Sequence, residues 1–124
     1  MTAAASGLRV LVVEDEMMVA MLIETMIMQL GHKVVGPVAR LDKAVEMAER
    51  EAVDLAILDV NLGGKEVYPV AAALAARGIP FIFATGYGKG GLRAPYHDRP
   101  TLRKPYLSND LREAMAAVCG SKQE

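Results

Sequence analysis

Short apolar runs that alternate with helical segments are the feature that most constrains the fold of this chain. The first run, RVLVV, has the continuous β-branched and apolar character of a strand covered on both faces of a parallel sheet. The predicted strands are Arg9–Val13, Lys33–Gly36, Val53–Leu58 and Pro80–Ala84. The predicted helices cover about 17–30, 42–51, 66–77 and 107–118. This alternation favours an α/β fold, in which a parallel sheet has right-handed crossovers and helices on both faces.

The stretch 86–103 does not continue the pattern. It contains four glycines and two prolines and has no periodic apolar stripe. We expect a fifth strand near residues 99–103, and we expect the helix before it to be short or disordered.

Length and composition place limits on the class of protein. A chain of 124 residues with 52% hydrophobic residues predicts one domain over residues 1–124, with a core at about 8–119. The net charge of −1 gives no reason to expect direct nucleic-acid or membrane binding. One cysteine, no signal-peptide pattern and no apolar run of membrane-spanning length favour a cytoplasmic protein.

Polar residues follow the predicted strands at the edge where ligands bind in open parallel sheets. They are Glu14 and Asp15 after the first strand, Asp59 after the third, Thr85 after the fourth and Lys104 near the fifth. Each has an ordinary structural explanation alone, such as a helix cap, a turn residue or a solvated lysine. Their joint placement in this order favours a functional site.

The residue types of this set would suit phosphoryl transfer. Clustered carboxylates repel one another unless a hard cation such as Mg²⁺ or Mn²⁺ is bound. Such an ion would leave Asp59 free to attack phosphorus, and Thr85 and Lys104 would hold phosphoryl oxygens.

Four motifs resemble those of two-component response regulator receiver domains: LVVEDE, LAILDVNLGG, FATGYG and KPY, within a likeness that covers about 8–118. The resemblance implies a flavodoxin-like (βα)5 fold with strand order 2-1-3-4-5. It implies that Asp59 accepts a phosphoryl group from a histidine kinase or histidine phosphotransfer protein, and that the domain signals to a downstream protein target. No other enzymatic activity is expected beyond this self-phosphorylation and slow autodephosphorylation.

The same resemblance implies roles for the remaining site residues. Asp15, Asp59 and the backbone carbonyl of Asn61 would hold the metal, with Glu14 acting either directly or through water. The peptide bond before Pro105 would be cis.

Two positions depart from the common receiver pattern. Thr101 stands where the family usually has an aromatic residue that moves on activation, and Gly63–Gly64 replaces the common Pro-Gly. Without the usual aromatic residue, we expect the segment 86–100 to be mobile and Tyr87 or Tyr96 to respond to activation.

The motif FATGYG resembles that of the FAT-GUY type of receiver, and many members of this type are single-domain regulators in general stress signalling. We therefore expect a stand-alone protein that is a monomer or weak dimer. The alternative is a receiver domain excised from a hybrid kinase.

The segment 17–30 is rich in methionine. If Val19 and Ile23 face the sheet, Met18 and Leu22 lie toward solvent. They are either additional core or a deformable surface on which a kinase or phosphotransfer protein docks, a use that suits methionine.

Other classes of protein remain as alternatives. A metal-dependent α/β phosphatase or nucleotide-binding domain would use the same acidic edge, but the chain has neither GxGxxG after the first strand nor GxxxxGK[ST]. A receiver-like module that only binds proteins would be expected to lose the acceptor aspartate or the lysine, and this chain has both.

Overall fold

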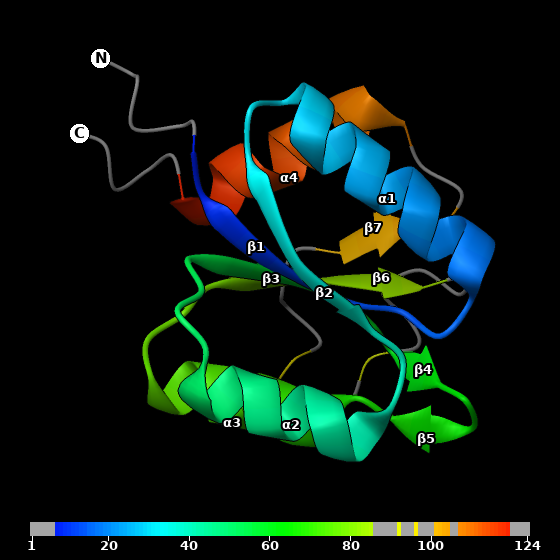
Figure 1. Ribbon diagram of the computed structural model, residues 1–124, viewed down its shortest axis with the longest axis vertical. Coiled ribbons are helices and arrows are strands. Elements are labelled where there is room, and N and C mark those ends of the chain that lie inside the picture. Colours follow the sequence, from blue (N-terminus) through cyan, green and yellow to red (C-terminus); the bar gives the residue numbers. More distant parts are fainter. Residues whose placement is uncertain (1–6, 86–91, 93–95, 97–100, 105–106, 120–124) are drawn as a thin grey trace.

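The computed structural model describes residues 7–85, 92, 96, 101–104 and 107–119. The strands are β1 (Arg9–Val13), β2 (Lys33–Val38), β3 (Leu55–Asp59), β4 (Asn61–Leu62), β5 (Lys65–Glu66), β6 (Phe81–Thr85) and β7 (Thr101–Arg103). The helices are α1 (Met17–Gln29), α2 (Leu41–Arg50), α3 (Tyr68–Ala76) and α4 (Ser108–Cys119). Figure 1 shows them as a central sheet with helices on both sides.

The main sheet is parallel and has the order β2-β1-β3-β6-β7. Counting only these strands along the chain, this is the predicted order 2-1-3-4-5, so the flavodoxin-like fold is confirmed. The fifth strand, predicted near residues 99–103, is β7, which pairs with β6 from Phe83↔Thr101 to Thr85↔Arg103.

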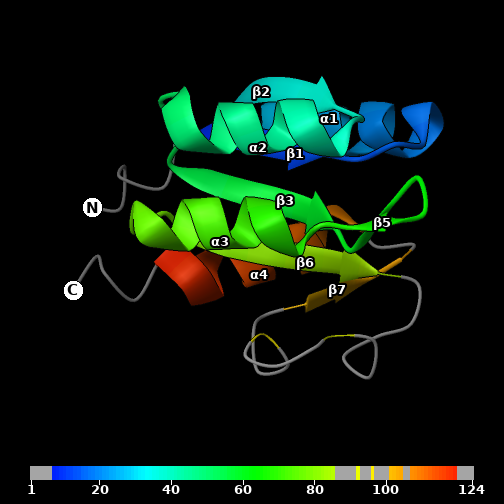
Figure 2. The ribbon, with the colours of Figure 1, turned by 90° about the horizontal axis from the view of Figure 1, so that it is seen from below.

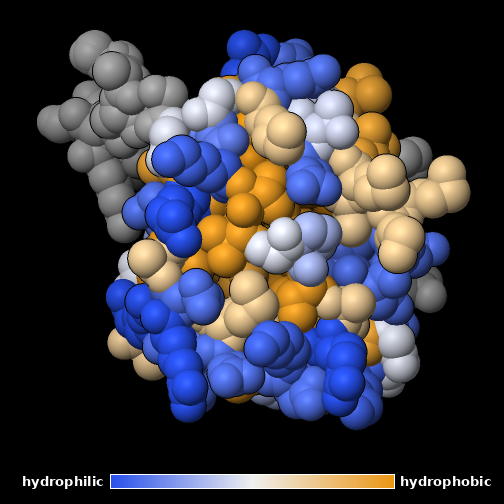
Figure 3. Space-filling view, viewed as in Figure 1, coloured by the Kyte–Doolittle hydropathy of each residue, from blue (hydrophilic) through white to orange (hydrophobic). Residues whose placement is uncertain are grey.

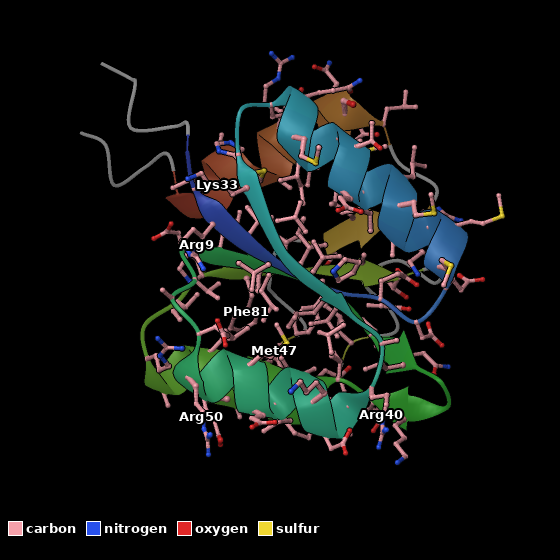
Figure 4. All side chains as sticks on the ribbon, viewed as in Figure 1. Arg9, Lys33, Arg40, Met47, Arg50 and Phe81 are labelled. Carbon is pink, nitrogen blue, oxygen red and sulfur yellow. The ribbon has the colours of Figure 1, made fainter. Side chains whose placement is uncertain are left out.

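Two apolar cores lie on opposite faces of the sheet because successive strand residues point to opposite sides. Leu11, Leu58 and Phe83 belong to the core under α2 and α3, whereas Val12 and Ile57 belong to the core under α1 and α4. Figure 2 shows α2 and α3 in front of the sheet and α1 and α4 behind it, and in Figure 4 Phe81 and Met47 lie between the sheet and α2. Burial on both faces explains why β3 and β6 have no polar residue before their last position.

The β4–β5 hairpin was not predicted. The sequence predicted a helix from about residue 66, but Glu66 pairs with Asn61 and α3 begins at Tyr68. Gly63 and Gly64 both have positive φ angles, 63° and 89°, which is the conformation that a two-residue hairpin turn requires. The glycine pair therefore forms a tight antiparallel turn beyond the end of β3.

Several sequence predictions fall on residues outside the described part of the chain. The expected short or disordered helix and the response of Tyr87 belong to this group, as does the cis bond at Pro105. Within the same stretch, Leu92 is buried and Tyr96 is half-buried against the α3 side of the sheet.

No helix in the described residues has the length and apolar character needed to cross a membrane.

Candidate functional site

The sheet brings the predicted site residues to one edge. Glu14 follows β1, and Asp59 ends the neighbouring strand β3, opposite Ala84 of β6. Thr85 ends β6, and the backbone N–H of Lys104, just after β7, donates to the carbonyl oxygen of Thr85 at 2.9 Å. Four strands thus place the acids, the hydroxyl and the ammonium at the carboxyl edge of the sheet, which is where ligands bind in open α/β folds.

The ammonium of Lys104 lies between two carboxylates. Its Nζ is 3.0 Å from Oε1 of Glu14 and 3.2 Å from Oδ2 of Asp59. All three side chains are largely shielded from solvent, with the Lys104 side chain 18% exposed. Because water screens these charges poorly, the lysine is held between its two partners rather than in solvent.

Backbone groups hold the other oxygens of the two carboxylates. The N–H of Glu16 donates to Oε2 of Glu14 at 3.1 Å, and the N–H of Asn61 donates to Oδ1 of Asp59 at 3.3 Å. Each carboxylate therefore has one oxygen toward a backbone N–H and the other toward Lys104. This arrangement fixes the orientation of Asp59, the proposed acceptor.

Burial, followed by the negative charge of Glu14, raises the pKa of Asp59, and the opposing charge of Lys104 lowers it by less, so that the pKa is about 7. Without a cation, Asp59 is therefore partly protonated near neutral pH. Burial alone lowers the pKa of Lys104, but contact with the Glu14 carboxylate and the charge of Asp59 outweigh it, so this pKa lies above its ordinary value. The lysine stays charged.

The acidic cluster fits a hard divalent cation. Glu14, Asp15 and Asp59 each offer a carboxylate oxygen, and these oxygens lie within 4.8 Å of one another. Oε1 of Glu14 is buried, and its partner among the described residues is the ammonium of Lys104. Three anionic oxygen donors at this spacing match the preference of Mg²⁺ for hard oxygen ligands.

Asp15 and Glu14 differ in a way that bears on the predicted ligands. Asp15 is exposed, whereas Glu14 is buried and already engaged by Lys104 and the N–H of Glu16. A Cβ atom on Gly63 would lie 3.7 Å from Oδ2 of Asp15, so the hairpin turn borders the cluster. Asp15 is therefore the most solvent-accessible carboxylate of the three.

Thr85 and the predicted docking residues occupy different surroundings. Thr85 is buried, and strand alternation places its side chain on the same face as Phe81 and Phe83.

Met18 and Leu22, the predicted docking residues, are exposed on α1, so they lie outside the core.

An aromatic cluster on the Thr85 side was only partly foreseen. The ring of Tyr96 stacks on Tyr68 of α3, with centroids 5.4 Å apart and planes 3° apart, and meets Phe81 and Phe83 edge-on. The sequence singled out Tyr96 but gave no sign of its partners, because Tyr68 begins a helix far away along the chain. The buried pairing of Glu14 with Lys104 was missed for the same reason.

Fold and site together define a class of protein, an α/β domain with an acidic, lysine-containing site at the end of a five-stranded parallel sheet. The family model for the response regulator receiver domain matches residues 10–116, and the chain belongs to this family. It is the receiver domain of a two-component response regulator, and phosphorylation on an aspartate is the general function of the family. Receiver domains are in general signalling domains rather than enzymes, they bind Mg²⁺ in an acidic site, and they interact with kinases or phosphotransfer proteins.

Individual relatives agree with this assignment. The transcriptional regulatory protein PdtaR of Mycobacterium tuberculosis is 30% identical over 112 residues, which are 87% of this chain and 55% of PdtaR. The chain thus spans about half the length of that curated relative.

Two solved structures are also similar. SdrG from Sphingomonas melonis Fr1 is 42% identical with a TM-score of 0.81, over 92% of this chain and 97% of SdrG. The receiver domain of the sensor histidine kinase PA1611 from Pseudomonas aeruginosa is 26% identical with a TM-score of 0.77, over 93% and 99% of the two chains. That structure has a magnesium ion coordinated in its active-site cleft.

Proposed function

We propose that the chain is a single receiver domain whose Asp59 accepts a phosphoryl group from the phosphohistidine of a histidine kinase or phosphotransfer protein. The observation that carries the proposal is the position of Lys104, whose ammonium lies 3.2 Å from Asp59 and 3.0 Å from Glu14. Two buried carboxylates hold this lysine in place. When Asp59 forms a bond to phosphorus it loses its own negative charge, and Lys104 can then bind the anionic phosphoryl group instead.

Transfer would proceed with little proton chemistry in the protein. A carboxylate oxygen of Asp59 forms the bond to phosphorus while the phosphorus–nitrogen bond of the donor breaks. The departing imidazole keeps the electron pair of that bond and takes up a proton from solvent. The protein contributes orientation, through the Asn61 N–H, and positive charge, through Lys104.

A bound Mg²⁺ or Mn²⁺ would neutralise the cluster and favour the ionised form of Asp59. We propose that Asp15, Asp59 and the backbone carbonyl of Asn61 hold it, with Glu14 as a further direct or water-mediated ligand. The presence of three carboxylate oxygens within 4.8 Å of one another supports this set. In the phosphorylated state Lys104 and the Thr85 hydroxyl would each bind a phosphoryl oxygen, until water attacks phosphorus and releases phosphate slowly.

The signal would leave the site through the aromatic cluster. Thr85 lies two residues after Phe83 on the same face of β6, and Phe83 touches Tyr96 with ring centroids 5.6 Å apart. Thr101 of β7 lies beside Phe83 in the register and has no aromatic ring to move. We therefore propose that a shift of Thr85 toward the phosphoryl group is passed through Phe83 to Tyr96.

The donor protein would dock beside the site on α1. This helix begins at Met17, two residues after Asp15, and it exposes Met18 and Leu22. A donor histidine that reaches Asp59 must bring its surrounding surface against this end of α1. We further propose that these exchanges take place in the cytoplasm and that the phosphorylated domain acts on a downstream protein.

Incubation with acetyl phosphate tests the proposal. The intact mass should increase by one phosphoryl group when Mg²⁺ is present and should not increase in excess chelator. Lys104→Met, which retains an unbranched side chain of similar length, should lower the extent of labelling. Full labelling without a divalent cation, or in Asp59→Asn, would contradict the proposed site.

A further inference from the structure

The α1 helix exposes an unusual number of methionine side chains. Met17 is 76% exposed, Met18 84% and Met21 58%, and Leu22 lies among them at 51%. Figure 3 shows apolar side chains over the α1 end of this face, and in Figure 4 sulfur atoms, in yellow, project from α1. A core helix needs only its inward face, here Ala20, Ile23, Met26 and Ile27, to be apolar. The exposed methionines are therefore not required by the fold.

The position of these three residues ties them to the site. They occupy the first two turns of α1, which starts two residues after Asp15. Met28 is also exposed, at 59%, but it lies 11 residues beyond Met17. That separation corresponds to roughly 16 Å along a helix that rises 1.5 Å per residue. The methionines of the first two turns are therefore those of α1 that lie closest along the chain to Asp15.

Exposed thioethers are the side chains on this surface that mild oxidants modify most readily. Hydrogen peroxide transfers one oxygen atom to sulfur as the O–O bond breaks, which leaves a sulfoxide and one molecule of water. Reduction by two thiols of a methionine sulfoxide reductase removes that oxygen as water and leaves a disulfide on the reductase. The modification turns an apolar, flexible side chain into a polar one and can be reversed.

We propose that Met17, Met18 and Met21 form a reversible oxidation site that controls docking of the phosphodonor protein. The proposal rests on the proposed function, in which the donor covers this end of α1. A sulfoxide buried under an apolar partner surface loses its hydrogen bonds to water, and such burial is costly. Oxidation would thus reduce phosphotransfer from a protein without altering the chemistry at Asp59.

Peptide mapping after graded exposure to hydrogen peroxide tests the site itself. The chain offers internal controls, because Met26 is 6% exposed and Met115 is 5% exposed. Sulfoxide should form on Met17, Met18 and Met21 before it forms on these buried residues, and a methionine sulfoxide reductase should remove it. Equal rates at buried and exposed methionines, or sulfoxide on α1 that the reductase leaves in place, would overturn the proposal.

Phosphotransfer assays test the control of docking. The probe is a phosphorylated histidine phosphotransfer domain chosen because it labels the unoxidised protein. Peroxide treatment should slow this labelling roughly tenfold, since burial of one unpaired polar group weakens binding by roughly 5- to 150-fold. Labelling by acetyl phosphate should stay unchanged, and its failure in untreated protein would instead contradict the proposed function.

Matched variants separate oxidation at the site from general damage. The triple variant Met17→Leu, Met18→Leu, Met21→Leu retains apolar side chains that favour helix, and its rate of transfer from the protein donor should be the same before and after peroxide treatment, whatever its rate without peroxide. The corresponding triple glutamine variant should be slow without peroxide. Met28→Leu should remain as sensitive as the parent. A triple leucine variant that loses transfer on oxidation as the parent does would refute the proposal.

Discussion

Replacement of Asp59 by asparagine should stabilise the metal-free protein although it removes the proposed acceptor. Asparagine has nearly the same shape and carries no charge. In the folded protein burial raises the pKa of Asp59 from its ordinary value of 3.8 to about 7, so the ionised form is disfavoured. The folded state binds a proton here more tightly than the unfolded state, and stability from this group therefore decreases as pH rises from about 4 to about 7.

The size of the effect follows from the pKa. A tenfold change in proton affinity corresponds to about 1.4 kcal/mol, so the difference between 3.8 and about 7 sets an upper bound of roughly 4 kcal/mol. The pKa of about 7 already includes the attraction between Lys104 and the Asp59 carboxylate. In the variant Lys104 still has Glu14 as a partner. After allowance for relaxation around the site, we expect Asp59→Asn to raise the free energy of unfolding by about 1–3 kcal/mol.

Urea denaturation in excess chelator at about pH 8 measures the difference, and the gain should shrink at about pH 5, where the parent binds a proton. Asp15→Asn is the matched control, because Asp15 belongs to the same cluster but is exposed, and it should change stability little. An Asp59→Asn variant no more stable than the parent at about pH 8 would refute the argument that this carboxylate is held at a cost in stability.

Three further predictions concern the metal, the pH response and the aromatic cluster. Saturating Mg²⁺ at a hundred times its Kd should stabilise the parent by about 2.7 kcal/mol in thermal unfolding, and Asp15→Ala should lose most of this gain; an unchanged Tm in the parent would count against the site. Burial lowers the pKa of His32, whose Nδ1 accepts the Leu8 N–H, so the unfolded state takes up a proton first and stability should fall as pH drops through 6.5. His32→Gln should remove that part of the slope in urea titrations, and an identical slope in both proteins would contradict the assignment. A double-mutant cycle with Tyr68→Leu and Tyr96→Leu should show a coupling of about 0.5–1.5 kcal/mol, whereas additive losses would mean that the stacked pair contributes nothing of its own.

Those features of the fold and site that follow from a repeating sequence pattern were predictable. Continuous apolar runs such as RVLVV predicted strands buried on both faces, and the parallel order then brought Glu14, Asp59 and Lys104 together. The exposure of Met18 and Leu22 followed from helical spacing in the same way. These features depend on repeating patterns that a single sequence displays.

Features that depend on one particular contact were not predictable. The β4–β5 hairpin has strands of two residues, which are too short for any alternation to appear in the sequence. Glu14 was expected as a metal ligand, but its burial against Lys104 arises from side chains that are distant in sequence. The stacking of Tyr96 on Tyr68 likewise depends on the path of a segment without periodicity.

Chemical trapping of the phosphorylated residue tests the central claim most directly. An aspartyl phosphate is an acyl phosphate, and borohydride reduces its carbonyl carbon to an alcohol, which converts the aspartate to homoserine. After incubation with acetyl phosphate and Mg²⁺, followed by borohydride and peptide mapping, homoserine should appear at position 59 and at no other aspartate. Homoserine at position 15, or a labelled protein in which position 59 remains aspartate, would contradict the assignment of Asp59 as the acceptor.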